Sequence, residues 1–174
     1  LIANNELALR RPEQADMREV LASNLEELHR LTGIVNDMLF LSQADRGVGA
    51  RRVPVASLAS MAADVLDYHE AALAEADLTA KVVGDAHGAF DVPLLRRALS
   101  NLLGNATRYA KNGSIVQVTF KPSDGGRVLL SVTNCGDTID PEILPHLFDR
   151  FFRGDPARSH GQSNHGLGLA IVGA

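Results

Sequence analysis

A predicted helix from Pro93 to Ala110 carries the residues best suited to chemistry. Its polar side chains recur at spacings of three and four residues, which places them on one face of a helix: Asn101, Asn105, Arg108 and Tyr109. A carboxamide oxygen can ligate Mg²⁺ without adding negative charge beside phosphates, and a guanidinium can hold a phosphate oxygen. The stripe therefore suits a magnesium-bound phosphate group. The alternative is a solvated helix face that carries two asparagines by chance.

Two loops that contain glycine make the phosphate interpretation more specific. In the loop 134–139, Gly136 allows a close approach to the backbone, and Asn134 or Asp137 can accept a hydrogen bond from a base amine. In the loop 164–170, glycines precede a predicted helix, where free backbone amides and the positive end of the helix dipole favour anions. Each loop alone is typical of an ordinary turn. The two loops and the asparagine stripe, in this order, indicate a nucleotide site.

The elements that must position these residues begin with a helical region, residues 1–46. A break at Pro12 separates the end of one helix from a second helix, whose apolar residues repeat every seven positions, as at Leu21, Leu28 and Val35. Asn24 falls on this stripe and can fix its register. We expect an incomplete helical hairpin whose apolar stripe must be covered by a partner chain or by the next domain. A symmetric dimer is the simplest solution.

Residues 47–54 form a predicted linker, and residues 55–174 then alternate between helical and β-rich patterns. We expect helices over 55–76, 93–110 and 143–152, with Asp91 capping the second of them. Strands are expected over 78–83, 87–90, 114–120 and 127–132, the last two joined as a hairpin, and 153–165 is expected to be a mobile loop. The predicted fold class is α+β, with a mixed sheet layered against helices behind the incomplete hairpin.

Composition and charge exclude several classes of protein. The chain has 174 residues, of which 45% are hydrophobic, so it can bury a sizeable core. A net charge of −4 argues against a general nucleic-acid binder, and the single cysteine, Cys135, excludes an internally disulfide-linked scaffold. No apolar run approaches the roughly 18 residues that span a bilayer. Because the chain starts at Leu1 and stops within an apolar pattern, we expect a fragment cut at both ends.

Taken together, these segments resemble the ATP-binding part of bacterial sensor histidine kinases, within the superfamily that also holds gyrase and MutL. Residues 99–109 match the N box, 134–139 the first glycine box, 147–154 the F box and 166–170 the second glycine box. The residues around Asn134 and in the F box are most similar to those of copper and heavy-metal sensor kinases. The resemblance implies a two-layer α/β sandwich of the histidine kinase ATPase type over 55–174, truncated at its C-terminus. Residues 1–46 are similar to the end of the dimerisation and phosphotransfer hairpin.

The resemblance also implies roles for individual residues. Asn105 matches the Mg²⁺ ligand, and the positions that match ATP contacts are Asn101, Asn105, Arg108, Tyr109, Asn134, Gly136, Thr138, Ile139, Phe148, Gly166, Leu167, Gly168 and Leu169. Phe148, Phe151 and Phe152 match aromatic residues that anchor the ATP lid. Asn134 stands where the family usually has Asp, so the adenine amine would be bound without charge assistance. Thr138 and Asn164 stand where the family has glycine.

The phosphoacceptor histidine of the family has no match in the chain. Its motif is His-Glu-Leu-Arg with a nearby proline, on the first hairpin helix, which lies mostly upstream of residue 1. His69 is followed by Glu70 but lacks the arginine and proline and lies in the wrong region, and His29 has no acid after it. The remaining histidines are not spaced as metal ligands: His87, His146, His160 and His165. No catalytic residue is therefore assigned within the chain.

The resemblance implies a protein-histidine kinase that uses Mg²⁺ and ATP. The γ-phosphoryl group would pass to a histidine of the hairpin and then to an aspartate of a response regulator receiver domain. It further implies a homodimer through the N-terminal helices, no nucleic-acid partner, and a cytoplasmic portion of a bacterial inner-membrane protein that is anchored by upstream segments. Two alternatives are an ATP-hydrolysing machine and a nucleotide-binding module without catalysis. The first needs a glutamate base where Asn101 stands, and an amide is a poor base.

Overall fold

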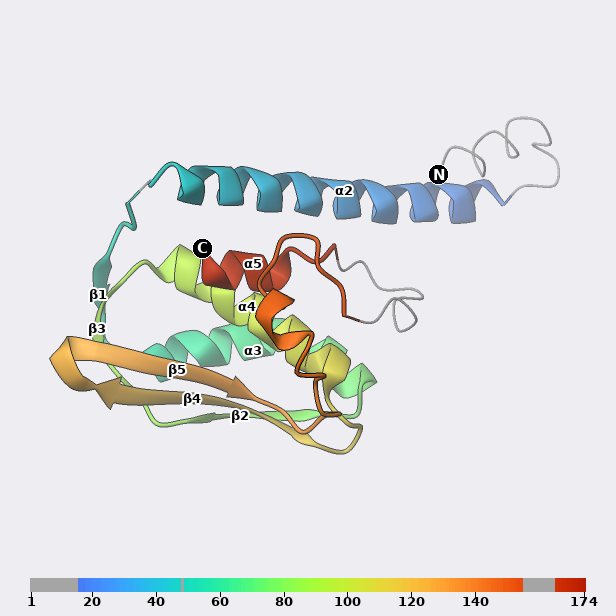
Figure 1. Ribbon diagram of the computed structural model, residues 1–174. Coiled ribbons are helices and arrows are strands. Elements are labelled where there is room, and N and C mark those ends of the chain that lie inside the picture. Colours follow the sequence, from blue (N-terminus) through green and yellow to red (C-terminus); the bar gives the residue numbers. More distant parts are fainter. Residues whose placement is uncertain (1–15, 48, 155–164) are drawn as a thin grey trace.

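The long helix α2 (Met17–Asp45) lies across a mixed unit of helices and strands in the computed structural model, which describes residues 16–47, 49–154 and 165–174 (Figure 1). After α2 come β1 (Val53–Val55), α3 (Leu58–Glu75), β2 (Thr79–Val83), β3 (Gly88–Phe90), α4 (Val92–Tyr109), β4 (Ile115–Ser123), β5 (Arg127–Thr133) and α5 (Gly168–Gly173). The predicted α+β class is confirmed. The predicted first arm of the hairpin and most of the loop 153–165 lie outside the described residues.

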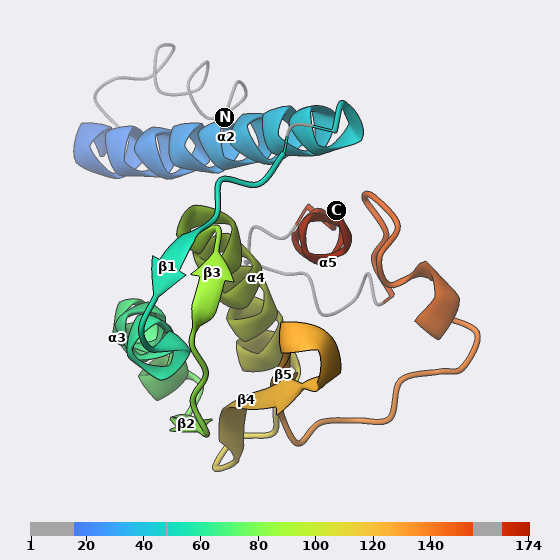
Figure 2. The same ribbon diagram turned by 90° about the vertical axis from the view of Figure 1, so that its left-hand side faces the viewer.

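A three-stranded sheet with the order β2-β4-β5 forms one layer of the mixed unit. β2 runs parallel to β4, and β4 pairs with β5 as the predicted antiparallel hairpin, with Phe120 opposite Leu130. α3 and α4 cover one face of this sheet (Figure 1). The core lies between the two layers, and its largest fully buried side chains there are Phe120, Leu58, Leu99, Leu103, Val116 and Val118. Figure 2 shows α5 end-on, beneath α2 and beside α4.

Helix α4 begins at a capped terminus, as its sequence predicts. The Asp91 carboxylate accepts a hydrogen bond from the backbone N–H of Leu94 at 3.1 Å, and Pro93 occupies the first turn. The other carboxylate oxygen accepts from the N–H of Arg51 at 2.7 Å. Asp91 thus fixes both the start of α4 and the chain segment that leads into β1, which pairs with β3 just before the cap.

Replacing Asp91 with alanine is expected to lower the free energy of unfolding by about 1–2 kcal/mol, because an N-cap and a second backbone hydrogen bond are lost together. Urea denaturation followed by circular dichroism measures the change. Asp124→Ala, in the exposed hairpin loop, is the matched control and should shift stability by less than about 0.5 kcal/mol. Equal effects of the two substitutions would contradict the capping role.

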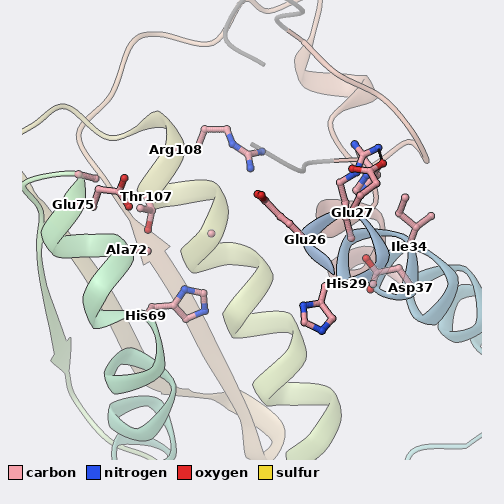
Figure 3. Close-up of a pocket in the computed structure, with 15 residues that line it drawn as sticks. Glu26, Glu27, His29, Ile34, Asp37, His69, Ala72, Glu75, Thr107 and Arg108 are labelled. Atoms are coloured by element: carbon pink, nitrogen blue, oxygen red, sulfur yellow. Dashed lines mark hydrogen bonds and ion pairs between the residues drawn. The ribbon is translucent and has the colours of Figure 1, made fainter. Parts of the chain in front are cut away.

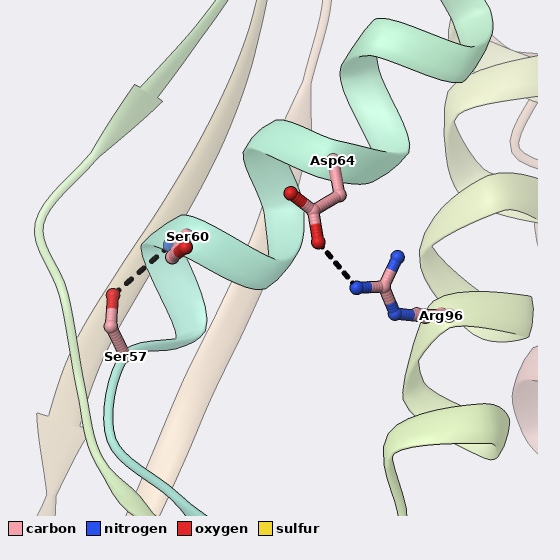
Figure 4. A network of polar contacts seen from close by, with 4 residues as sticks. All are labelled: Ser57, Ser60, Asp64 and Arg96. Atoms are coloured by element: carbon pink, nitrogen blue, oxygen red, sulfur yellow. Dashed lines mark hydrogen bonds and ion pairs between the residues drawn. The ribbon is translucent and has the colours of Figure 1, made fainter.

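Helix α3 is capped and tied to α4 by polar contacts (Figure 4). Ser57 Oγ accepts from the N–H of Ser60 at 3.0 Å, and Asp64 pairs with Arg96 across the two helices. Both members of the ion pair are substantially exposed, so the pair contributes at most about 1 kcal/mol. Farther along, His69 Nε2 and Ser100 Oγ lie 2.7 Å apart. Ser100 immediately precedes Asn101, so this contact braces α4 next to its polar stripe.

Three predicted element boundaries are wrong. β1 starts at Val53, inside the predicted linker 47–54, because this segment pairs with β3. The helix predicted to start at residue 55 begins at Leu58, because Val55 belongs to β1 and Ser57 caps the helix. The predicted helix over 143–152 is reduced to a single 3₁₀ turn, Leu144–His146. Pro145 supplies no N–H and disfavours the α conformation of the residue before it. The turns around it are closed by hydrogen bonds from an N–H to the carbonyl oxygen three residues earlier, such as His146 N–H to Ile143 O at 3.0 Å.

Helix α2 is confirmed, but its apolar residues divide between two faces. Leu41 is buried and packs with Ile34 and Phe40 against the buried residues of α5 and its leading loop. The predicted heptad stripe is left largely exposed: Met17, Leu21, Leu25, Leu28, Leu31, Val35, Met38 and Leu39. The mixed unit therefore covers a different face of α2 from the one that carries the heptad repeat.

Candidate nucleotide-binding site

A cavity of about 760 Å³ lies where α4, the loop after β5 and the start of α5 meet. Twelve of the thirteen predicted ATP contacts line it: Asn101, Asn105, Arg108, Tyr109, Asn134, Gly136, Thr138, Ile139, Gly166, Leu167, Gly168 and Leu169. The exception is Phe148, whose side chain is 55% exposed and whose ring lies beside Gly173 at the other end of α5. Phe152, expected as a lid anchor, lines the cavity instead.

The polar stripe of α4 faces this cavity because the opposite side of the helix is buried in the core. Leu99, Leu103 and Ala106 are at most 3% exposed. The carboxamide of Asn101 also meets the start of α5, since a Cβ atom placed on Gly168 would lie 3.2 Å from Asn101 Oδ1. The second glycine box therefore packs directly on the N box, with little room for a larger residue at position 168.

The loop after β5 is held against the end of α4 by backbone contacts. Gly136 forms an antiparallel bridge with Ala110, and the N–H of Lys111 donates to Cys135 O at 2.8 Å. A Cβ atom on Gly136 would lie 2.5 Å from Tyr109 O, so only glycine allows this approach. The contact sets Asn134, which is half-buried, at one end of the cavity together with Thr138 and Ile139.

Gly166 joins the second glycine box to the F box. Its φ is +69°, and its carbonyl oxygen accepts from the N–H of Phe151 at 2.9 Å. A Cβ atom here would lie 2.6 Å from both Phe151 C and Phe152 O. The close approach brings together the two ends of the chain that flank residues 155–164, and it fixes where Leu167 enters the buried contact with α2.

A second cavity, of about 1090 Å³, lies between α2, α3 and α4 (Figure 3). Arg108 from α4 and Glu26 from α2 extend toward each other across it. Four residues line both cavities: Asp37, Gly104, Arg108 and His165. No residue of the loop 134–139 lines the second cavity. The two cavities therefore meet where Gly104 and Arg108 of α4 line both of them, a region called the Arg108 end below, and Asp37 of α2 forms part of the wall there.

Helix α2 is fixed in this position by two arginines of the mixed unit. Arg97 on α4 donates to Asp37 Oδ1 at 2.6 Å and to Asn36 O at 3.1 Å, and its guanidinium lies 4.3 Å from the centre of the Phe40 ring. Arg150 donates to both carboxylate oxygens of Asp45, at 2.7 and 2.9 Å. Asp37 and Asp45 are two turns apart, so both contacts lie on one side of α2.

Several lining residues have no signal in the sequence that points to this site. Asp37 lies more than 60 residues before the N box, and no local pattern connects the two. Asp140 follows the first glycine box directly, and Ile143 lies between that box and the F box. The remaining lining residues lie inside the matched N and F boxes, but their types alone gave them no role: Ser100, Gly104, Leu147, Arg153 and Gly154. His165 precedes the second glycine box directly, and its adjacency to Gly166 is the signal that could have found it.

Two features are absent from the described ranges 16–47, 49–154 and 165–174. No cluster of three or more His, Cys, Asp and Glu side chains is arranged there to hold a metal ion. None of the helices in those ranges combines the length and the apolar character needed to cross a membrane.

Comparisons with known proteins agree with one another. Residues 90–174 match the family of histidine kinase-, DNA gyrase B- and HSP90-like ATPases. The sensor histidine kinase CusS of Escherichia coli K12 is 43% identical over 99% of this chain, which spans 36% of the length of CusS. The mycobacterial sensor histidine kinase MprB has a solved structure that is 30% identical, with a TM-score of 0.58 over 71% of this chain and 76% of that one. Full-length ShkA in complex with AMPPNP is 26% identical, with a TM-score of 0.78 over 91% of this chain and 33% of that one.

Proposed function

Because the chain belongs to the sensor histidine kinases, we propose that the 760 Å³ cavity binds ATP with Mg²⁺ and that the chain is the ATP-binding catalytic part of a protein-histidine kinase. Asn134 and its loop would hold the adenine, and the α4 stripe with the second glycine box would hold the phosphates. The ShkA neighbour was solved with AMPPNP, an ATP analogue, which supports this choice of ligand.

The observation that carries the proposal is the continuity of the two cavities. Phosphoryl transfer depends on holding the terminal phosphate in line with its acceptor, with little other chemistry required of the protein. The cavity opens at its Arg108 end toward α2. An acceptor histidine on the helix that pairs with α2 in the hairpin would therefore stand beyond the terminal phosphate, on the side that the second cavity leaves open.

Asn105 fits the role of the magnesium ligand. It lies on α4 between Asn101 and Arg108, it is half-buried, and its side chain lines the cavity. A carboxamide oxygen is a hard, uncharged donor, which suits an ion whose other ligands are phosphate oxygens and water. When bound, the ion would neutralise charge on the phosphates. Asn105 would orient it, and Arg108 would hold a phosphate oxygen from the next turn.

Transfer to a histidine is favoured over hydrolysis because no carboxylate that lines the cavity is placed as a base for water. A hydrolase needs a base to activate water, and the position four residues before Asn105 carries an amide, Asn101. Asp37 is engaged by Arg97, and the other lining carboxylates, Asp137 and Asp140, belong to the chain just after Asn134. Glu26 approaches Arg108 only from α2, across the second cavity, and none of the carboxylates that line the first cavity stands four residues before Asn105.

The test uses the full protein with its hairpin, incubated with Mg²⁺ and ATP labelled at the γ-phosphate. We expect label on the protein that is lost in acid and retained in base, as for a phosphohistidine. Release of label only as free phosphate, unaffected by removal of the hairpin, would overturn the proposal in favour of an ATPase. Nucleotide binding without either product would leave a binding module.

We further propose the partners that this function implies. The exposed heptad stripe of α2 would pair with the same helix of a second copy, since a helix with so many exposed apolar side chains needs a covering surface. A response regulator receiver domain would take the phosphoryl group. In the whole protein, segments outside this chain would provide the membrane anchor and the sensor, and metal sensing remains a prediction from resemblance.

A further inference from the structure

His165 occupies the junction of the two cavities. It is one of only four described residues that line both, and it directly precedes Gly166. The Nε2 atom of its imidazole is buried and has no hydrogen-bond partner. A buried polar atom without a partner costs about 1–3 kcal/mol, so it normally indicates a group that is satisfied in another state of the protein.

Charged groups surround this imidazole from both sides of the junction. Burial lowers the pKa of His165 below its ordinary value. Among nearby charges, Arg30 on α2 and Arg153 at the F box lower the pKa, whereas Asp37 and Glu27 on α2 raise it. The lowered pKa favours the neutral imidazole, and in the tautomer with hydrogen on Nε2 this ring presents a donor toward the shared space.

The junction is where the last phosphate of a bound nucleotide would lie. The Asn134 loop lines the first cavity only, which sets the base outside the junction. Arg108 lines both cavities from α4, and His165 lines both from the loop that leads into α5. A phosphate between them would meet one donor from each element. A diphosphate would leave this position empty.

On this geometry we propose that His165 Nε2 donates a hydrogen bond to the terminal phosphate of a nucleoside triphosphate and thereby favours the triphosphate over the diphosphate. The inference rests on the proposed function. It assigns a role in nucleotide specificity to His165, the residue directly before the second glycine box. The phosphate charge would stabilise the imidazolium, so binding would be accompanied by proton uptake.

The test compares the affinity of the full protein for Mg²⁺-AMPPNP and for Mg²⁺-ADP. His165→Ala is expected to weaken AMPPNP binding about tenfold, the value of one hydrogen bond to a charged group, and ADP binding less than about twofold. His165→Gln keeps an N–H donor but cannot take up a proton, so it should restore only part of the difference. His87→Ala is the matched control, since His87 is exposed and lines neither cavity.

Calorimetry in two buffers of different ionisation enthalpy measures the number of protons taken up on binding. A residue with only a packing role would not change this number. Wild type should take up more protons on binding AMPPNP than His165→Gln does, and its affinity should fall as the pH rises through the pKa of the complex. Equal losses for both nucleotides, no loss for either, or equal proton uptake would overturn the role of His165. If wild type binds neither nucleotide, the proposed function itself fails.

Discussion

Replacing Asn105 with alanine is expected to reduce Mg²⁺-dependent nucleotide affinity by at least about a hundredfold. Loss of groups that merely support a metal ligand already costs 10–100-fold, and Asn105 is proposed as the ligand itself. Its carboxamide lines the cavity from the middle of the α4 stripe, between Asn101 and Arg108. The measurement is titration with a fluorescent ATP analogue, with Mg²⁺ and again with a chelator.

The controls separate the loss of the metal ligand from a general loss of folding or binding. Asn112→Ala, in the exposed turn after α4, removes the same side chain and should leave affinity unchanged. Asn105→Ala should keep its thermal stability, because the residue is only half-buried and contributes nothing to the core. With the chelator, wild type and Asn105→Ala should bind the nucleotide with similar, weak affinity. A hundredfold difference that persisted without Mg²⁺ would place the metal elsewhere.

A methyl group at Gly166 is expected to cost about 2–5 kcal/mol of folding free energy. Two effects add: an L-residue at a φ of +69° costs about 1–2 kcal/mol, and a Cβ at 2.6 Å from the backbone of Phe151 and Phe152 forces a shift of the kind that costs about 1–3 kcal/mol. Because neither contact atom is a flexible side chain, the loop must move. Nucleotide affinity should fall with it, since Leu167 and Gly168 follow directly.

Gly126→Ala is the matched control for this substitution. Gly126 has a φ of +71°, almost the same as Gly166, but a Cβ there would meet nothing within 4 Å. It should therefore show the conformational cost alone, about 1–2 kcal/mol, with unchanged nucleotide affinity. Urea denaturation and nucleotide titration of the two variants give the difference. Equal destabilisation would mean that the loop at Gly166 adapts without strain.

The arrangement also gives α2 a direct part in the site. Arg97 and Arg150 hold it at Asp37 and Asp45, and Leu41 packs between these positions against α5, which begins within the second glycine box. One side of α2 therefore borders the proposed phosphate end, while the heptad stripe remains available to a second copy. A shift of α2 would move Asp37 in the wall of both cavities, so hairpin geometry and nucleotide binding are expected to be coupled.

The sequence by itself determined the local structure of the site. The spacing of Asn101, Asn105 and Arg108 put them on one face of α4, because helical periodicity is a property of consecutive residues. Asp91 and Pro93 marked the start of that helix for the same reason. Pro145 likewise carried local information against an α-helix over 143–152, which the predicted helix did not take into account.

Only the tertiary structure decided which distant residues share the cavity. Asp37 reaches the site because Arg97, sixty residues later, binds it. Phe148 belongs to the matched F box but lies outside the cavity, and His165 lies at a junction that exists only once α2 is placed. Contacts of this kind depend on how whole helix faces fit together, through burial and charge pairing summed over several elements. Local periodicity fixes which face a residue occupies, but not what that face meets.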